Sequence, residues 1–175
     1  MQIFKYEKFD IGASGPSMRI FVSRKNSNFN VSKSLLNQIT FEKNWKLLSK
    51  KPYILFNQKV KNHKLKLLKL INKLIQKNHN IGCFSAPAKG NTLLNYLNIS
   101  NKIIKYVSEN NKRKIGKYTP GTHYKIVTDK DFLNKNISYA ILLSWNYKKF
   151  FIKNSEFIKK NNYFIIPMPN PHIKK

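Results

Sequence analysis

The stretch IGCFSAPAKGNTLLNYLNIS, residues 81–100, decides the fold predicted for this chain. It begins with apolar residues typical of a buried strand, breaks at Ala86 and Pro87, and continues with leucines at helical spacing. A strand, a loop of small residues and a helix, in this order, are the unit with which α/β proteins present backbone N–H groups to a ligand. The stretch therefore predicts a strand over 81–85, a helix over 88–97 and a candidate ligand site between them.

Strands and helices alternate through the rest of the chain. The expected elements are strands over residues 103–107, 139–143 and 163–167 and helices over residues 129–133 and 146–160. Strands that are separated by helices are too far apart for hairpins, so they imply crossover connections and a parallel sheet with helices on both faces. The sequence therefore predicts a compact α/β unit over residues 53–167, whose ligands bind beyond the carboxyl ends of the strands.

The N-terminal part of the chain has a different pattern. QIFKYEKF and SMRIFVSR alternate apolar and polar residues on either side of DIGASGPS, which predicts two antiparallel strands, about 2–9 and 18–24, joined by a turn. Ser32 is a candidate cap of a helix that is ended by Pro52, and a second, basic helix is expected over residues 54–78. An N-terminal β-hairpin and helices are thus expected ahead of the sheet. The predicted domains are residues 1–25 (hairpin), 26–52 (helical connector) and 53–175 (α/β domain).

The chain carries a formal net charge of +27, with 34 basic and 7 acidic residues. Such an excess is typical of proteins that bind polyanions, and it predicts weak, non-specific binding of nucleic acid or another polyanion. The base composition of the gene is a second explanation, because only three basic residues are arginines, and lysine, asparagine and isoleucine share A/T-rich codons. Both explanations stay open, although proteins that recognise phosphate usually also employ arginine, whose planar guanidinium binds phosphate in a bidentate manner.

Several classes of site are absent from the sequence pattern. Cys83 is the single cysteine, so the chain has no internal disulfide, and one cysteine with four scattered histidines does not make a zinc cluster. The acidic residues are dispersed and Cys83 lies inside a strand, so no catalytic residue and no metal ligand is predicted. No run approaches the roughly 18 apolar residues of a membrane helix. Because the N-terminus also lacks an apolar signal core, we expect a cytoplasmic protein without a membrane partner.

Polar and aromatic residues follow three of the predicted strands. The candidate substrate-binding residues are Ser85, Lys89, Asn91, His123, Trp145 and Asn146. A helix N-terminus beside a lysine and short polar side chains suits an anion or a sugar hydroxyl, and the histidine that follows a predicted Pro-Gly turn can donate or accept a proton. Each residue also has a purely structural explanation, for example Ser85 as a helix cap, His123 as a surface side chain and Trp145 as part of the core.

Four blocks of this sequence resemble one family of enzymes. GCFSAPAKGNTLLNYLNI, YVSENNKRKIGKYTPGTH and ILLSWNY resemble, in the same order and spacing, the C-terminal domain of the SAM-dependent sugar C-methyltransferases, and SGPSMRIFVSR resembles the segment before it. The resemblance extends from about Phe9 to Pro167, and AKGNTLLN is its most specific block. The chain departs from the pattern at Pro87, Glu109 and Ser144, where the family has a small residue, an aspartate and a proline.

The resemblance implies a Rossmann-like domain that helps to hold a nucleotide-linked deoxysugar. The family's zinc cysteines, its SAM-binding glycine loop and its proton-transfer residues match no residue of this chain, so SAM and zinc would belong to an upstream part. We therefore expect a chain that binds the nucleotide-linked sugar without a SAM site of its own and works with a separate chain carrying the SAM-binding domain. Whether this chain is itself an enzyme stays open. The alternatives are a basic accessory protein that binds nucleic acid and an inert remnant of a decayed methyltransferase gene.

Overall fold

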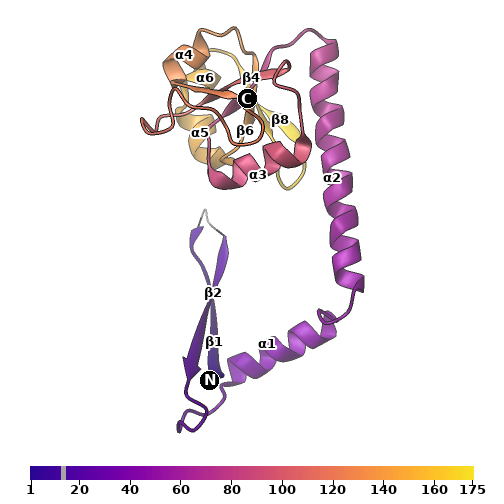
Figure 1. The fold of residues 1–175 in the computed structure, drawn as a ribbon, viewed down its shortest axis with the longest axis vertical. Helices are drawn as coiled ribbons and strands as arrows, with labels where there is room; N and C mark the ends of the chain where they lie inside the picture. The colour runs from indigo at the N-terminus through magenta and orange to yellow at the C-terminus, as the bar shows by residue number, and fades with distance from the viewer. Residues whose placement is uncertain (13–14) are drawn as a thin grey trace. The chain divides into compact units, whose positions relative to one another are not determined.

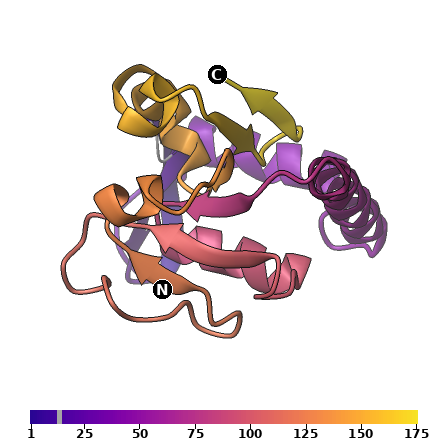
Figure 2. The ribbon, with the colours of Figure 1, turned by 90° about the horizontal axis from the view of Figure 1, so that it is seen from above.

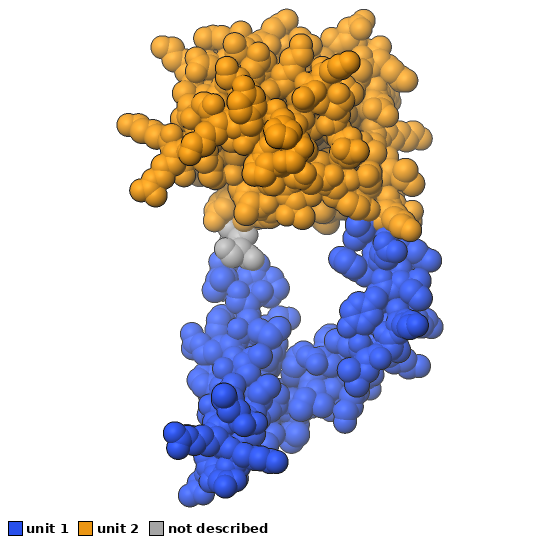
Figure 3. Space-filling model, viewed as in Figure 1, with its two compact units in different colours: residues 1–60 blue, residues 61–175 orange. Residues whose placement is uncertain are grey.

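The computed structural model describes every residue of the chain except 13 and 14, and part of the turn predicted between the N-terminal strands lies outside the described residues. The described residues form two compact units, Met1–Val60 and Lys61–Lys175, which are coloured separately in Figure 3. Helix α2 (Lys51–Gln76) begins in the first unit and ends in the second. No helix of the described residues has the length and apolar character needed to cross a membrane.

A six-stranded sheet forms the centre of the second unit. Its strands are β3 (Ile81–Phe84), β4 (Ile104–Ser108), β5 (Lys125–Val127), β6 (Tyr139–Leu142), β7 (Tyr163–Ile166) and β8 (His172–Lys174). They lie in the order β5-β4-β3-β6-β7-β8, and every neighbouring pair is parallel except β7 and β8 (Figures 1 and 2). The predicted α/β class, with a parallel sheet and flanking helices, is therefore confirmed.

Helices cover both faces of this sheet (Figure 2). They are α2, α3 (Ala88–Leu97), α4 (Asp129–Leu133), α5 (Lys148–Asn154) and α6 (Glu156–Lys159). Successive residues of a strand point to opposite faces, so Cys83 packs in the apolar cluster that includes α2 and α3, whereas Phe84 packs in the cluster that includes α4, α5 and α6. All four residues of β3 are buried, which explains why its sequence is apolar throughout.

The prediction of one helix over residues 146–160 is wrong. The segment forms a short 3₁₀ helix, η2 (Trp145–Tyr147), followed by α5 and α6. Ser155 separates the two α-helices, because its backbone is extended and its hydroxyl accepts a hydrogen bond from the N–H of Ile158. Serine caps a new helix more readily than it continues an old one. The short strands β5 and β8 were not predicted. The sequence pattern placed the residues of β5 in a loop and those of β8 in the C-terminal tail.

The first unit contains a hairpin and helices. Its elements are β1 (Gln2–Asp10), β2 (Pro16–Ser23), α1 (Lys33–Asn44) and the beginning of α2. β1 and β2 are antiparallel, as predicted, and Ser32 is the N-cap of α1. The prediction that Pro52 ends the first helix is wrong, because α1 ends at Asn44 and Pro52 lies in the first turn of α2. Proline suits a first helical turn, where its missing N–H has no helical partner.

The first unit has no core of its own. None of its described residues is buried. Met18, Ile20 and Val22, at alternate positions of β2, are 61%, 47% and 49% exposed. β2 pairs only with β1, and a two-stranded hairpin is marginally stable in water by itself. The buried apolar residues of the described chain belong to the second unit, which also holds the candidate site.

Candidate functional site

The loops that follow β3 and β6 are tied together at the carboxyl edge of the sheet. The order of the strands reverses between β3 and β6, and open α/β sheets bind ligands at such a switch point. Ser85 follows β3 with a positive φ of 64°, and its hydroxyl donates a hydrogen bond of 2.6 Å to the hydroxyl of Ser144, which follows β6. The N–H of Leu143 donates to the carbonyl of Phe84 at 3.0 Å.

A charged pair from the loop after β4 holds both peptide groups of Ala86. The carboxylate of Glu109 accepts a hydrogen bond from the N–H of Ala86 at 3.0 Å, and the ammonium of Lys114 donates one to the carbonyl of Ala86 at 2.8 Å. The two charged groups lie 3.5 Å apart. We call these three residues the Ala86 clamp. The clamp fixes the loop after β3 to the loop after β4.

The carboxyl group of Glu109 is held in its charged form. Partial burial raises its pKa, but the N–H groups of Asn111, Ala86 and Asn110 and the charge of Lys114 together lower it more. The pKa of Glu109 therefore lies below the usual value of a glutamate. The backbone bonds from Asn110 and Asn111 measure 2.9 and 3.2 Å. Because the charged form accepts these bonds, the clamp depends on the ionisation of Glu109.

Three of the predicted site residues form one cluster. The ammonium of Lys89 donates a hydrogen bond to Oδ1 of Asn146 and lies 4.9 Å from the centre of the Trp145 ring. Loss of hydration lowers the pKa of Lys89. A lysine placed over an aromatic ring and beside an amide can bind an anionic or hydroxyl-bearing ligand.

Helix α3 passes close to Leu143, the residue that follows β6, and a glycine at position 90 leaves room for this approach. A Cβ atom at Gly90 would come within 2.6 Å of the Cβ of Leu143. The N-cap of α3 is Pro87, whose side chain makes no capping hydrogen bond. Ser85 does not cap α3, so the structural explanation of this residue as a helix cap is wrong. The start of α3 is therefore positioned by close packing and by the loops around it.

A cavity of about 500 Å³ is lined by α3 and by the loop that follows β4. We call it the first cavity. Its lining includes Pro87, Asn91, Leu94, Arg113, Lys117 and Tyr118. The side-chain amide of Asn95 donates to the carbonyl of Pro120 at 3.0 Å and so ties the loop to α3. Oδ1 of Asn91 is buried and has no hydrogen-bond partner among the described residues.

A second cavity, of about 480 Å³, is lined by the loops after β3, β4 and β6. Its lining combines hydroxyl groups, the clamp and aromatic rings: Ser85, Glu109, Ser144, Tyr147, Phe150 and Phe151. Pro87 and Lys114 line both cavities. The Ala86 clamp therefore borders both cavities.

The sequence match agrees with this arrangement. The family model described as C-methyltransferase C-terminal domain matches residues 12–169. The chain belongs to this family. The match confirms the resemblance carried by the sequence blocks, all of which lie within it. No curated protein matches the chain.

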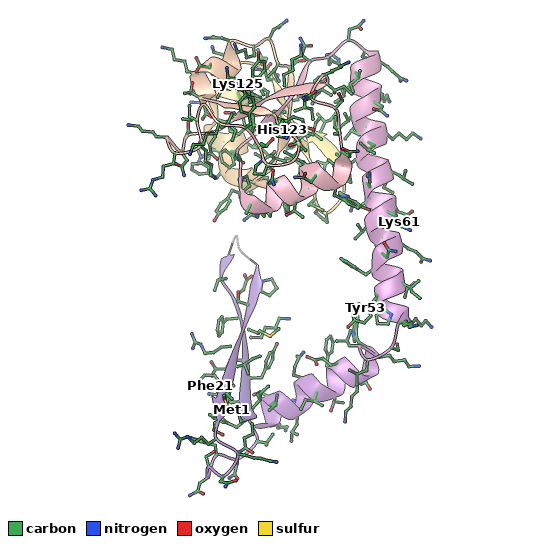
Figure 4. All side chains as sticks on the ribbon, in the orientation of Figure 1. Met1, Phe21, Tyr53, Lys61, His123 and Lys125 are labelled. Atoms are coloured by element: carbon green, nitrogen blue, oxygen red, sulfur yellow. The ribbon has the colours of Figure 1, made fainter. Side chains whose placement is uncertain are left out.

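In this C-methyltransferase C-terminal domain, His123 lines neither of the two cavities. It is exposed, has a positive φ of 55°, and its N–H donates to the carbonyl of Thr119 at 2.9 Å. Figure 4 shows its side chain among those of the second unit. Of the other predicted site residues, Ser85 and Asn91 each line one of the two cavities, whereas Lys89, Trp145 and Asn146 form the Lys89 cluster and line neither.

Sequence analysis missed the charged residues of the loop after β4. Glu109 and Lys114 form the clamp, while Arg113 and Lys117 line the first cavity. Their signal was the run ENNKRKIGK, residues 109–117, placed directly after a predicted strand. The sequence places this polar run at a strand end, but in a chain so rich in lysine none of its charged residues was chosen as a site residue.

Cys83 is buried among the apolar side chains of the second unit. Burial raises the pKa of the Cys83 thiol far above its usual value, so the residue behaves as a packed apolar side chain. No group of three or more histidine, cysteine, aspartate or glutamate side chains suited to a metal ion occurs in the described part of the chain.

Proposed function

We propose that this C-methyltransferase C-terminal domain binds a nucleotide-linked sugar at the carboxyl edge of its sheet. The observation that carries the proposal is the pair of adjoining cavities at the switch point, which are bordered by cations, amides, hydroxyl groups and aromatic rings. These are the groups that bind phosphate and sugar oxygens. The family match supports the link to methyl transfer.

The Lys89 cluster and the two tied loops have separate roles in this proposal. Lys89 supplies a positive charge and Asn146 an amide, so both contact oxygen atoms of the ligand. The bond between Ser85 and Ser144 and the Ala86 clamp hold the surrounding loops in one arrangement before the ligand arrives. A preformed site binds more tightly, because less conformational freedom is lost on binding.

We propose further that SAM and zinc are held by a separate polypeptide that carries the SAM-binding domain. Such a domain would supply the methyl donor, while the present chain would hold the acceptor sugar. Support for a partner comes from the first unit, whose described residues include no buried side chain and whose strand β2 exposes an apolar row at Met18, Ile20 and Val22. Exposed apolar patches of this kind mark protein interfaces.

Calorimetric titration of the full chain with a panel of nucleotide-linked sugars tests the proposal. We expect at least one to bind, and Lys89→Ala to weaken it about tenfold or more, since a hydrogen bond from a charged group contributes about 1.5–3 kcal/mol. Lys102→Ala is the matched control, because Lys102 is exposed and precedes β4, at the opposite edge of the sheet. Failure of every nucleotide-linked sugar to bind, or equal losses in both variants, contradicts the proposal.

A further inference from the structure

We propose that the first cavity holds the nucleoside diphosphate half of the ligand and that the second cavity holds the sugar. This inference rests on the proposed function and deepens it, because it assigns the two halves of a nucleotide-linked sugar to different residues. The assignment follows from three differences between the cavities: the balance of charge, the nature of the lining and one buried amide.

The first difference is charge. Arg113 and Lys117 line the first cavity, and neither forms an ion pair with any residue that the structure describes. Lys114 also lines it, but its charge is balanced by Glu109 at 3.5 Å. Two unbalanced cations on one loop suit the adjacent negative charges of a diphosphate, and the guanidinium of Arg113 can bind phosphate oxygens in a bidentate manner.

The second difference is the lining. The apolar side of the first cavity, formed by Pro87, Leu94, Ile126 and Leu143, accepts a flat, weakly polar group such as a nucleobase. The exposed ring of Tyr118 adds a stacking surface. In the second cavity the charged groups of the clamp balance each other, and the remaining lining pairs hydroxyl groups with aromatic rings. Hydroxyl groups and aromatic faces suit a neutral sugar ring better than a diphosphate.

The third difference is the buried amide of Asn91. Its backbone N–H is used inside α3, where it donates to the carbonyl of Pro87 at 3.1 Å. Its Oδ1 atom has no partner among the described residues, although Asn91 lines the first cavity. Leaving a buried acceptor unpaired destabilises the folded chain. Oδ1 is covered by surrounding atoms, so a ligand that donates an N–H or O–H to it must first displace part of this lining. Such a bond removes the penalty, and Asn91 is assigned to bind the nucleoside in this way.

The shared residues of the two cavities fit a single ligand that occupies both. Lys114 lines each of them, and so does Pro87. A diphosphate in the first cavity therefore has its sugar end at the Ala86 clamp, next to Ser85 and Ser144. This arrangement places the bond between phosphate and sugar at the boundary between the cavities.

Titration of the full chain with uridine and thymidine diphosphates, and separately with the corresponding nucleotide-linked glucoses, tests the assignment. Arg113→Ala and Lys117→Ala should each weaken both kinds of ligand about tenfold. Lys112→Ala is the control, because Lys112 lies in the same loop, is exposed and does not line the cavity. It should change either affinity by less than about twofold. Ser144→Ala should weaken only the nucleotide-linked glucose.

Asn91→Leu separates binding from structural support. Leucine has a similar size and no acceptor to leave unpaired, so this variant should melt at a higher temperature than the wild type while binding the diphosphates about tenfold more weakly. A residue with a purely structural role would change affinity and melting temperature in the same direction. Unchanged diphosphate affinity in Asn91→Leu overturns the role of this amide.

The possible outcomes distinguish this inference from the proposed function. If nucleotide-linked glucose binds but Arg113→Ala and Lys117→Ala behave like Lys112→Ala, the assignment of the first cavity is wrong and the proposed function stands. If the free diphosphates bind with the expected losses but none of the nucleotide-linked sugars binds, the assignment of the first cavity to a diphosphate stands, whereas the assignment of the second cavity to a sugar and the proposed function are wrong. If neither kind of ligand binds the wild-type chain, both are wrong.

Discussion

Replacing Glu109 with glutamine should break the Ala86 clamp and lower the stability of the second unit. The carboxylate accepts hydrogen bonds from the N–H groups of Ala86, Asn110 and Asn111 and pairs with Lys114. Glutamine has one acceptor oxygen, so it can keep the bonds from residues 110 and 111, but it then turns its NH₂ group toward two other donors. One charge-assisted hydrogen bond and the ion pair are lost. We expect the free energy of unfolding at pH 7 to fall by about 2 kcal/mol.

The pH dependence of this loss follows from the lowered pKa of Glu109. A group whose pKa is lower in the folded state contributes its stabilisation fully above the unfolded pKa, about 4.3 for a glutamate. That contribution disappears as the pH falls through the lower, folded pKa. The difference between wild type and Glu109→Gln should therefore be largest at neutral pH and shrink under acid conditions. Urea denaturation followed by circular dichroism at pH 7, 5 and 3 measures it.

Lys114→Met provides the companion measurement. This variant removes the ion pair and the bond to the carbonyl of Ala86 but leaves the three N–H groups on Glu109. The losses of the two single variants should not add up in the double variant, because the residues share a partner and interact directly. A Glu109→Gln protein within about 0.5 kcal/mol of wild type at pH 7, or a difference that stays constant from pH 7 to pH 3, would refute the reasoning.

Four other predictions concern packing, a buried hydroxyl group, methyl transfer and nucleic-acid binding. Gly90→Ala should lower the free energy of unfolding by about 1–3 kcal/mol despite alanine's better helix propensity, because the new Cβ would lie 2.6 Å from the Cβ of Leu143. Urea denaturation measures this change, and a variant more stable than the wild type would contradict the prediction. Tyr124→Phe should cost about 1–2 kcal/mol, since the buried hydroxyl donates to the carbonyl of Ile99 at 2.5 Å; an unchanged melting temperature would count against it. The chain alone should neither bind SAM nor transfer its methyl group. Incubating the purified chain with labelled SAM and nucleotide-linked sugars tests this, and transfer of label to a sugar without any added protein would disprove it. Nucleic acid should bind weakly and lose affinity steeply with salt, so a sequence-specific complex at physiological salt in a fluorescence polarisation assay would favour the nucleic-acid-binding alternative.

The sheet could be predicted from sequence because its central strands carry unbroken apolar runs. β3, β6 and β7 are buried almost throughout, and each run is bounded by residues that favour loops. β5 lacked such a signal, since it has only three residues and begins with an exposed lysine. The Ser-Glu pair that follows α5 indicates the start of a new helix at Ser155. The apolar residues on either side of the pair keep helical spacing, and for this reason the sequence pattern predicted one continuous helix.

The candidate site was predictable only where one strand end determines the position of a residue. Lys89, Trp145 and Asn146 meet because the carboxyl ends of β3 and β6 are neighbours in a parallel pair. Glu109 and Lys114 meet through the path of a loop, which no periodicity describes. His123 was assigned to the site because it follows a predicted Pro-Gly turn and can donate or accept a proton, yet it is exposed and lines neither cavity.

The absence of buried side chains among the described residues of the first unit determines what calorimetry of this chain will measure. The heat-capacity increase on unfolding comes mainly from apolar surface that becomes hydrated, and it averages about 12–15 cal/mol/K per residue in ordinary domains. Residues 61–175 hold the buried apolar side chains and will account for nearly all of that increase. The measured heat-capacity increase per residue should fall clearly short of this average when it is calculated over the whole chain. It should match the average when it is calculated over the residues of the second unit alone. A polypeptide that covers the first unit would raise the heat-capacity step of the complex above the sum of its parts.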